Sequence, residues 1–186
     1  MSHMILFTAT GGLLATILWL GRDSANVLRH ALLRPALLAL MALLLLLVAA
    51  DEGVLWPFGL IAAACLCAIG ESYSGIYRLL AAPPRRSTAL DQVRISTLWL
   101  INVLTNLVLL NLSVHLAYPS TFQWRGDPAS LLDVVYFTLL TFASGGYGDV
   151  LPVTALGKLL AMLTSLVGLT YGTILFAALF QWLRAD

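Results

Sequence analysis

Charged residues are scarce in this sequence. Its 186 residues include ten Lys or Arg and nine Asp or Glu, which is 10% of the chain, whereas 60% are hydrophobic. A soluble domain carries about 25% charged residues, because it needs polar surface to cover its core. The scarcity excludes an ordinary soluble fold and indicates a membrane protein surrounded by the lipid bilayer. The net charge of +1 gives no reason to expect a nucleic-acid partner.

Cysteine is almost as rare, and no group of residues typical of an active site is present. Cys65 and Cys67 stand two positions apart in an apolar run. On a helix this spacing points them to different faces, so neither a disulfide nor a metal site follows. The apolar segments hold no paired carboxylates and no His or Cys constellation. We therefore expect no enzyme activity and no cofactor.

Long apolar runs are what the sequence does contain. A helix needs about 20 apolar residues to span a bilayer, with about 17 as a practical minimum. One further apolar run, residues 131–143, is only 13 residues long. That length suits a re-entrant helix, whose irregular return is tolerated only where protein or a water-filled pore surrounds it. Five runs come close to the spanning length: residues 4–20, 35–50, 53–70, 95–118 and 155–183.

The basic residues predict how the chain is divided and oriented. Pro83-Pro84-Arg85-Arg86 is a helix-breaking basic stretch. It separates an N-terminal three-helix unit (1–82) from a cytoplasmic linker (83–94) and a pore domain (95–186). With the re-entrant loop outside, eight of the ten basic residues fall inside, as the positive-inside rule requires. The N-terminus is then expected outside and the C-terminus in the cytoplasm.

The most informative motif directly follows the short apolar run. It reads Ser144-Gly145-Gly146-Tyr147-Gly148-Asp149. A dehydrated cation needs a cage of oxygens, which stacked backbone carbonyls from several chains can build. All carbonyls point inward only if the backbone alternates between ordinary and left-handed dihedrals, and glycine reaches the latter cheaply. Gly146 and Gly148 on either side of Tyr147 fit that alternation.

This segment resembles the pore of the potassium-channel family, whose signature is Thr-Val-Gly-Tyr-Gly-Asp after a short pore helix. The resemblance covers roughly residues 95–183 and includes an inner helix similar to that of bacterial two-helix channels. It implies an all-α membrane protein of five transmembrane helices plus a re-entrant pore helix, assembled as a homotetramer, in a bacterial inner or plasma membrane. K⁺ would be the permeant ion, held at Ser144, Gly145, Gly146 and Tyr147, with Gly148 completing the filter and Asp149 at its outer mouth.

The motif departs from the family signature at two positions. Ser144 stands where the family has Thr, and Gly145 where it has Val. Glycine removes a stiff branched side chain and gives a looser cage. We therefore expect K⁺ to pass better than Na⁺, with weaker discrimination than in a Thr-Val-Gly-Tyr-Gly relative. Leu140 occupies a pore-helix position where some relatives hold a glutamate, so no carboxylate pair with Asp149 is expected.

The last apolar run contains Gly168 and Gly172, one helical turn apart. Two interpretations are open, a gating hinge or a close contact between helices. Asn102, Thr105 and Asn106 form a polar stripe on the fourth run, where interhelical hydrogen bonds are expected. No run carries arginines at three-residue spacing, so no voltage sensor is predicted. Only Arg184-Ala185-Asp186 follows the last run, and no soluble regulatory domain is expected.

Three alternatives to a potassium channel stay open. The first is a weakly selective channel for monovalent cations. The second is a subunit of a potassium transporter, although such transporters usually hold four pore loops in one chain and this chain has one. The third is a membrane interaction protein with a degenerate loop, which would conduct nothing.

Overall fold

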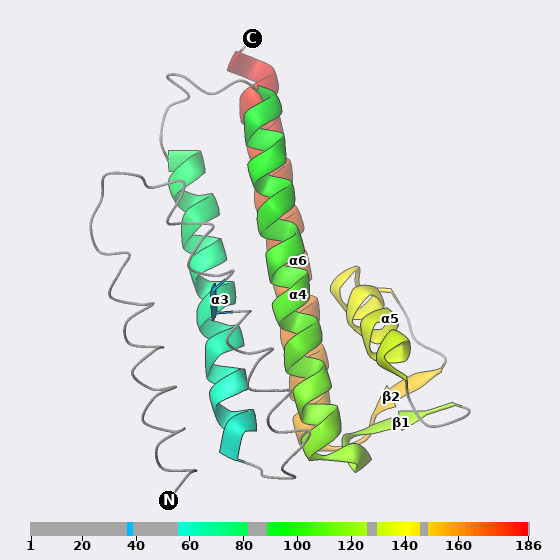
Figure 1. Ribbon diagram of the computed structural model, residues 1–186. Coiled ribbons are helices and arrows are strands. Elements are labelled where there is room, and N and C mark those ends of the chain that lie inside the picture. Colours follow the sequence, from blue (N-terminus) through cyan, green and yellow to red (C-terminus); the bar gives the residue numbers. More distant parts are fainter. Residues whose placement is uncertain (1–36, 39–55, 82–88, 126–129, 146–148, 186) are drawn as a thin grey trace, which may run out of the picture.

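The computed structural model describes residues 37–38, 56–81, 89–125, 130–145 and 149–185. Long helices dominate, joined by one short helix, a 3-10 turn and two short strands (Figure 1). The first predicted span and nearly all of the second lie outside the described residues. In chain order the elements are α3 (Trp56–Ala81), α4 (Ala89–Ala117), η2 (Pro119–Thr121), β1 (Phe122–Trp124), α5 (Leu131–Phe142), β2 (Val150–Pro152) and α6 (Ala155–Ala185).

Three of these helices are long and apolar enough to cross a membrane. Their apolar parts are Phe58–Tyr77 in α3, Ser96–Ala117 in α4 and Ala155–Ala177 in α6. They run side by side, and α5 lies to one side with the two strands below it (Figure 1). A helix satisfies all its backbone hydrogen bonds internally, which is what hydrocarbon demands of a single spanning segment. These helices correspond to the last three predicted spans, and α5 to the predicted short helix.

Two helices are longer than their apolar runs. α3 continues to Ala81, and α4 begins at Ala89, inside the predicted linker 83–94. A count of apolar residues finds the part of a helix that crosses the hydrocarbon. Backbone hydrogen bonding continues beyond it into polar sequence, because water tolerates charged side chains on a helix. The stretch between these two helices is therefore shorter than the sequence predicted.

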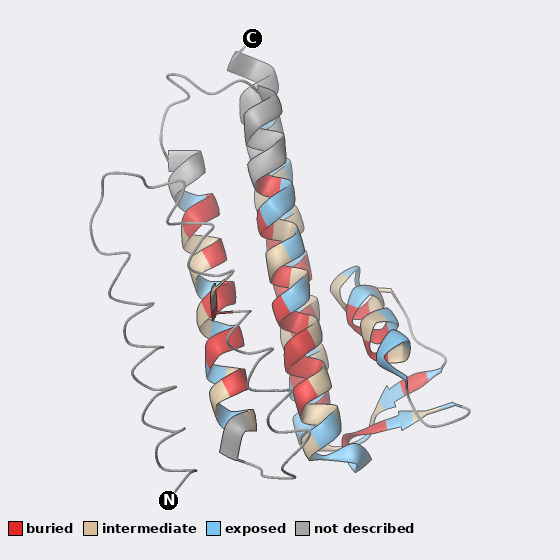
Figure 2. Ribbon diagram, in the orientation of Figure 1, coloured by how far each residue is buried: buried red, intermediate tan, exposed pale blue. Residues whose placement is uncertain are grey.

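The core lies between α3, α4 and the inner side of α6 (Figure 2). Two clusters of buried side chains follow each other along the bundle, one containing Ile61, Cys65 and Leu110 and the other Trp99 and Val103. Cys65 is buried and Cys67 half-buried, and both are free thiols. The buried positions of α6 recur every three or four residues, with Gly168 next to one of them, which gives the helix one packed face and one open face: Gly157, Leu160, Thr164, Val167, Gly168 and Tyr171.

The polar stripe on α4 makes one contact between helices. The Ser72 hydroxyl of α3 donates to Asn102 Oδ1 over 3.3 Å, and Asn106 Nδ2 donates to the same oxygen over 3.1 Å. Thr105 instead donates to the carbonyl of Ile101 in its own helix. The stripe thus contributes one interhelical bond, through Asn102.

The sequence did not predict the small antiparallel sheet. Strands β1 and β2 pair with Phe122 opposite Pro152, Gln123 opposite Leu151 and Trp124 opposite Val150. Because β1 follows α4 after the short η2 and β2 leads into α6, the sheet joins the two ends of the loop that carries α5. This pairing fixes where the loop returns.

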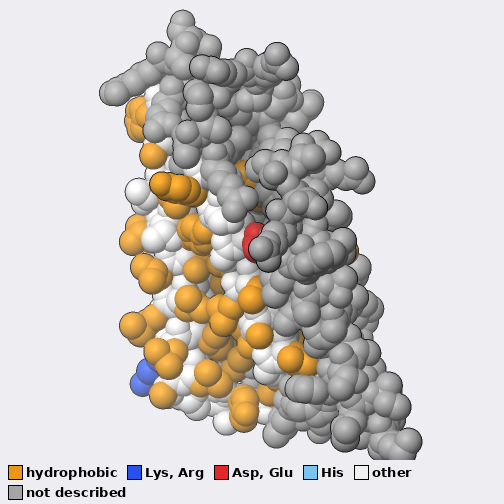
Figure 3. Space-filling model, turned by 90° about the vertical axis from the view of Figure 1, so that its left-hand side faces the viewer, with side chains coloured by type: hydrophobic (Ala, Val, Ile, Leu, Met, Phe, Trp, Pro, Cys, Tyr) orange, Lys and Arg blue, Asp and Glu red, His pale blue; other side chains and the backbone are white. Residues whose placement is uncertain are grey.

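The described surface on the side shown in Figure 3 is hydrophobic over its whole height, and charged side chains are sparse on it. Leu66, Leu98 and Ile101 are about half exposed, at 48%, 50% and 55%. Water would penalise such a surface and lipid would not. The outer faces of these helices therefore suit a bilayer.

Candidate functional site

The short helix α5 begins at a capping box. Ser130 Oγ accepts from the backbone N–H of Asp133 over 3.3 Å, and Asp133 Oδ2 accepts from the N–H of Ser130 over 2.7 Å. The Ser130 hydroxyl also donates to this carboxylate over 2.7 Å. These hydrogen bonds from the Ser130 side chain and backbone lower the pKa of Asp133. The first turn of α5 is fixed by its own sequence.

The buried face of α5 is packed against α4 and β1. The ring of Phe137 lies 5.0 Å from that of Phe122 and 6.4 Å from that of Trp124, between centroids. Asn111 Nδ2 of α4 donates to Thr138 Oγ1 over 3.3 Å. Asn111 was not singled out in the sequence. Its signal is an asparagine in the C-terminal half of a mostly apolar span that also contains Asn102 and Asn106.

The end of α5 is closed by two backbone hydrogen bonds. The N–H of Ser144 donates to the carbonyl of Thr141 over 3.0 Å, and that of Gly145 to the carbonyl of Leu140 over 2.8 Å. Ser144 has a φ of 55°, in the left-handed region. This pattern is the Schellman motif, which satisfies carbonyls at a helix end. Ser144 and Gly145, the first two predicted filter positions, are therefore also the cap of the short helix.

The same helix end lies against α6. A Cβ on Gly168 would come 1.9 Å from the carbonyl oxygen of Phe142, so no larger residue fits there. Ser165 Oγ donates to the carbonyl of Thr141 over 3.2 Å. A Cβ on Gly172 would meet nothing within 4 Å. Of the two interpretations of these glycines, Gly168 has the geometry of a close helix contact, whereas Gly172 faces open space in this chain.

Beyond the cap, Gly146, Tyr147 and Gly148 lie outside the described residues. Asp149, on the far side of this gap, is exposed. Its carbonyl accepts from the N–H of Arg125 over 2.8 Å, which extends the β1–β2 pairing. The hydroxyl of Tyr136 donates to Asp149 Oδ2 over 3.4 Å, at the long end of the hydrogen-bond range. Both ends of the undescribed segment are thus tied to the scaffold.

The contact between Tyr136 and Asp149 was missed in the sequence. The sequence comparison considered position 140 as the possible partner of Asp149, and leucine there cannot bond it. Tyr136 lies four residues earlier, on the same face of α5 as Leu140. With Arg125, Ser130 and Asp133 these two residues border an outer pocket of about 380 Å³.

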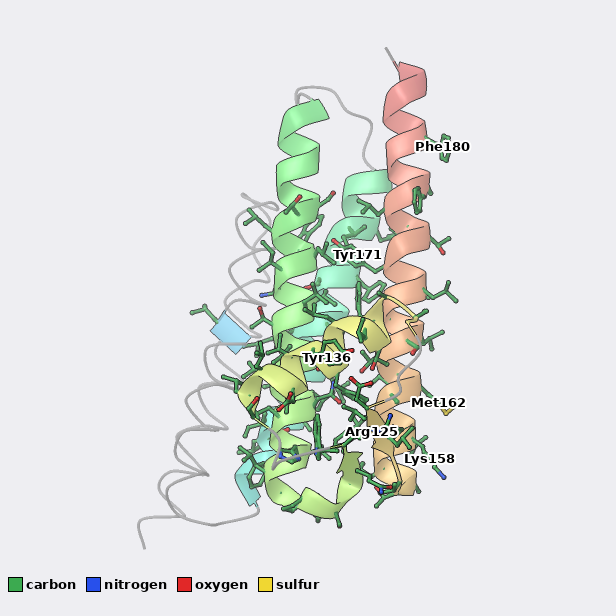
Figure 4. All side chains as sticks on the ribbon, turned by 90° about the vertical axis from the view of Figure 1, so that its right-hand side faces the viewer. Arg125, Tyr136, Lys158, Met162, Tyr171 and Phe180 are labelled. Atoms are coloured by element: carbon green, nitrogen blue, oxygen red, sulfur yellow. The ribbon has the colours of Figure 1, made fainter. Side chains whose placement is uncertain are left out.

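On the opposite side of the helix end, α5 and α6 enclose an open groove of about 680 Å³. Polar groups of Thr141, Ser144 and Ser165 meet at its upper part, and the rest of the lining is apolar and comes from α6. Figure 4 shows Met162 and Phe180 projecting from α6 away from the other helices, whereas Tyr171 points among them. The open face of α6 bears a regular series of exposed side chains: Leu159, Met162, Leu166, Leu169, Phe176 and Phe180.

The C-terminal end of a helix carries a partial negative charge from its aligned carbonyls. Thr141 near this end of α5 and Ser144 just beyond it both line the groove. Among the described residues, no group of three or more His, Cys, Asp or Glu side chains could hold a metal ion. Among the residues that line the groove, Thr141, Ser144 and Ser165 carry hydroxyl groups, and oxygen ligands of this kind suit hard cations.

Comparison with known families agrees with this geometry. Residues 99–185 match a family model described as an ion channel. The matched segment takes in most of α4, both strands, α5 and the whole of α6. Searches of curated proteins and of solved structures found no match to the chain.

Proposed function

We propose that the chain is one subunit of a potassium-type channel in a membrane, on the basis that residues 99–185 match a family model described as an ion channel. Four copies would surround a central pore and conduct monovalent cations passively. Ser144, Gly145, Gly146, Tyr147 and Gly148 would form the filter, with Asp149 at its outer mouth.

The observation that carries this proposal is the fixing of both ends of the Gly-Tyr-Gly segment. On the inner side, the Gly145 N–H is bonded to the carbonyl of Leu140. On the outer side, the Asp149 carbonyl is bonded to the N–H of Arg125. A segment held at both ends can keep its carbonyls in a row, as an ion cage requires. The partial negative end of α5 would favour a cation entering from the groove.

The open face of the subunit supports assembly around an axis. Among the described residues, the lining of the groove comes from α5, Ser144 and α6, and the exposed apolar series of α6 continues beyond it. On α5, Leu131, Leu132 and Leu139 are exposed at 61%, 74% and 43%. One loop supplies only part of a ring of oxygens, so further copies must complete it. Four copies would bury both faces and enclose the groove as a cavity under the filter.

The remainder of the chain fits this arrangement. The pore domain would be 95–186, preceded by the linker 83–94 and the three-helix unit 1–82, with the N-terminus outside and the C-terminus in the cytoplasm. α3 packs along α4, which supports a position of the N-terminal unit outside the pore helices. No cofactor is proposed, and K⁺ is the transported ion rather than a resident metal.

A weakly selective cation channel is the second candidate, and Gly145 is the observation that favours it. The three atoms nearest to a Cβ at this position would all belong to Leu140, and the nearest would lie 3.3 Å away. Gly145 is held to the pore helix by its backbone N–H alone, without the side-chain contact that a valine would add. The two candidates differ in the reversal potential measured with K⁺ on one side and Na⁺ on the other.

Purified protein in liposomes tests the proposal directly. We expect K⁺ flux that exceeds Na⁺ flux and that Ba²⁺ blocks. Gly146→Val is the control, because a branched residue cannot adopt the left-handed backbone predicted there; it should abolish flux while leaving the oligomer intact. Absence of flux from correctly assembled protein would contradict a channel, and equal K⁺ and Na⁺ fluxes would select the second candidate.

A further inference from the structure

Tyr73 of α3 reaches across to α6. Its hydroxyl donates to the carbonyl of Val167 over 2.6 Å and lies 2.6 Å from the hydroxyl of Thr170. Both partners belong to α6, so this one side chain joins α3 to α6. A tyrosine hydroxyl is both donor and acceptor, so it can bond both groups at once.

The turn of α6 held by Tyr73 is held from two other directions. Tyr171 donates its hydroxyl to the carbonyl of Ser96 in α4 over 2.7 Å. The ring of Tyr171 packs edge-on against that of Tyr73, with centroids 6.4 Å apart, and 6.3 Å from the ring of Phe142 at the end of α5. α3, α4 and α5 therefore converge on this one turn of α6.

Within that turn lies Gly168, whose backbone abuts the Phe142 carbonyl. Two residues further along the chain from Phe142 is Ser144, the first predicted filter residue. A short chain of contacts thus runs from Tyr73 through Val167 and Gly168 to the cap of α5. One turn towards the C-terminus, Gly172 has open space around its Cβ position.

We propose that α3 acts as a clamp on the pore through Tyr73. The hydroxyl fixes the 167–171 turn of α6 against the end of α5 and so biases the equilibrium between conducting and non-conducting arrangements of α6. Tyr73 is a positioning residue, because it touches α6 and no predicted ion site. This inference rests on the proposed channel function and gives the N-terminal unit a part in it.

Tyr73→Phe removes the hydroxyl and keeps the ring. Tyr77→Phe is the matched control, because Tyr77 lies one turn away on the same helix and is 72% exposed. In single-channel recordings we expect Tyr73→Phe to shift the ratio of open to closed time by about threefold to thirtyfold, the range typical of a lost hydrogen bond between membrane helices. Conductance and reversal potential should stay unchanged, since the filter is not touched. Tyr77→Phe should behave as the unmodified protein.

Thr170→Val tests whether the Thr170 hydroxyl is the hydrogen-bond partner through which Tyr73 acts. Because Tyr73 and Thr170 share one bond, the double variant should shift the ratio little more than the larger single effect. Open and closed times of Tyr73→Phe equal to those of the unmodified protein would overturn the clamp, as would fully additive effects of the two changes.

Hydrogen–deuterium exchange separates the clamp from the channel function. In purified protein, Tyr73→Phe should speed exchange in the peptide covering 166–172, relative to Tyr77→Phe. If the unmodified protein passes no ions, the proposed function fails, while this exchange still decides whether Tyr73 holds α6. Identical exchange in both variants would show that it does not.

Discussion

Ser144 combines two tasks in one residue. Its backbone adopts the left-handed conformation that ends α5, and its side chain lies at the top of the groove. A non-glycine residue in that conformation costs roughly 1 kcal/mol, so the surrounding structure must hold it there. The Schellman hydrogen bonds on either side supply that restraint. Glycine would adopt this backbone conformation more easily than serine. We therefore expect the serine hydroxyl to be the reason for a side chain at this position.

Ser144→Ala should weaken Ba²⁺ block from the inner side by about tenfold. The change keeps a Cβ and hence the same backbone preference, but removes the four hydroxyl ligands of the ring, and a net loss of about 1.4 kcal/mol gives a tenfold effect. Block measured in planar bilayers checks this. Thr173→Ala, an exposed α6 position whose hydroxyl bonds the Leu169 carbonyl in its own helix, is the control. Unchanged block in Ser144→Ala would exclude the hydroxyl as a ligand.

Gly145→Val should raise the selectivity for K⁺ over Na⁺. The φ of Gly145 lies outside the left-handed range, so the backbone admits valine. Its Cβ would stand 3.3 Å from the Leu140 carbonyl oxygen, and a small shift would seat it against α5. Gly145→Ala should give an intermediate value, because it adds contact without a branched side chain. A reversal potential already close to the K⁺ value in the unmodified protein would refute the prediction.

At the scale of the element, α5 is a 12-residue helix stabilised at both ends and along one side. An isolated helix of that length is marginal in water. Here the capping box fixes its start, the Schellman motif fixes its end, and Phe137 anchors its centre. These restraints hold α5 in a fixed direction relative to α6. The direction of α5 determines where its C-terminal end, which carries a partial negative charge, points.

The capping box predicts that acid destabilises the start of α5. The pKa of Asp133 lies below its ordinary value of 3.8 because the carboxylate accepts hydrogen bonds from Ser130. Its contribution to stability is therefore present above that ordinary value and is lost as the pH falls through the lowered pKa. Thermal unfolding of the detergent-solubilised protein should show a lower melting temperature in this acid range. In Asp133→Asn the drop should be smaller, and pH profiles of the two proteins with the same shape would contradict the role of this carboxylate.

At the scale of the whole molecule, the two faces of α6 in the described bundle differ in packing. α6 is packed on α3, α4 and α5 along one face and bare along the other (Figure 4). The bare face carries the groove and the exposed series from Leu159 to Phe180. This bare apolar face is the surface that the proposed tetramer would cover.

We expect a four-fold assembly with a weak response to voltage. Moving one elementary charge through 100 mV yields only about 2.3 kcal/mol, so steep gating needs several arginines crossing the field. The three described spans, Phe58–Tyr77, Ser96–Ala117 and Ala155–Ala177, contain no arginine. Mass measurement in detergent checks the four copies, and recordings over a wide voltage range check the response. A steep sigmoidal opening curve would show that the N-terminal helices sense voltage.

The sequence by itself determined the membrane class, the last three spans and the position of the short helix, predicted at 131–143 and observed at Leu131–Phe142. These features depend on the length and the composition of apolar runs, because a spanning helix must match the thickness of the bilayer and be apolar within it. The motif at residues 144–149 likewise indicated a channel pore, and residues 99–185 match an ion-channel family model.

Only the tertiary structure decided which faces of the helices meet. In lipid, both the packed and the exposed faces of a helix are apolar, so periodicity does not distinguish them as it does in water. The contact of Gly168 with Phe142, the bond from Tyr136 to Asp149 and the reach of Tyr73 to Val167 each join residues far apart in the chain. They arise from the rotation of α3, α5 and α6 about their own axes, and that rotation is set by packing three helices together.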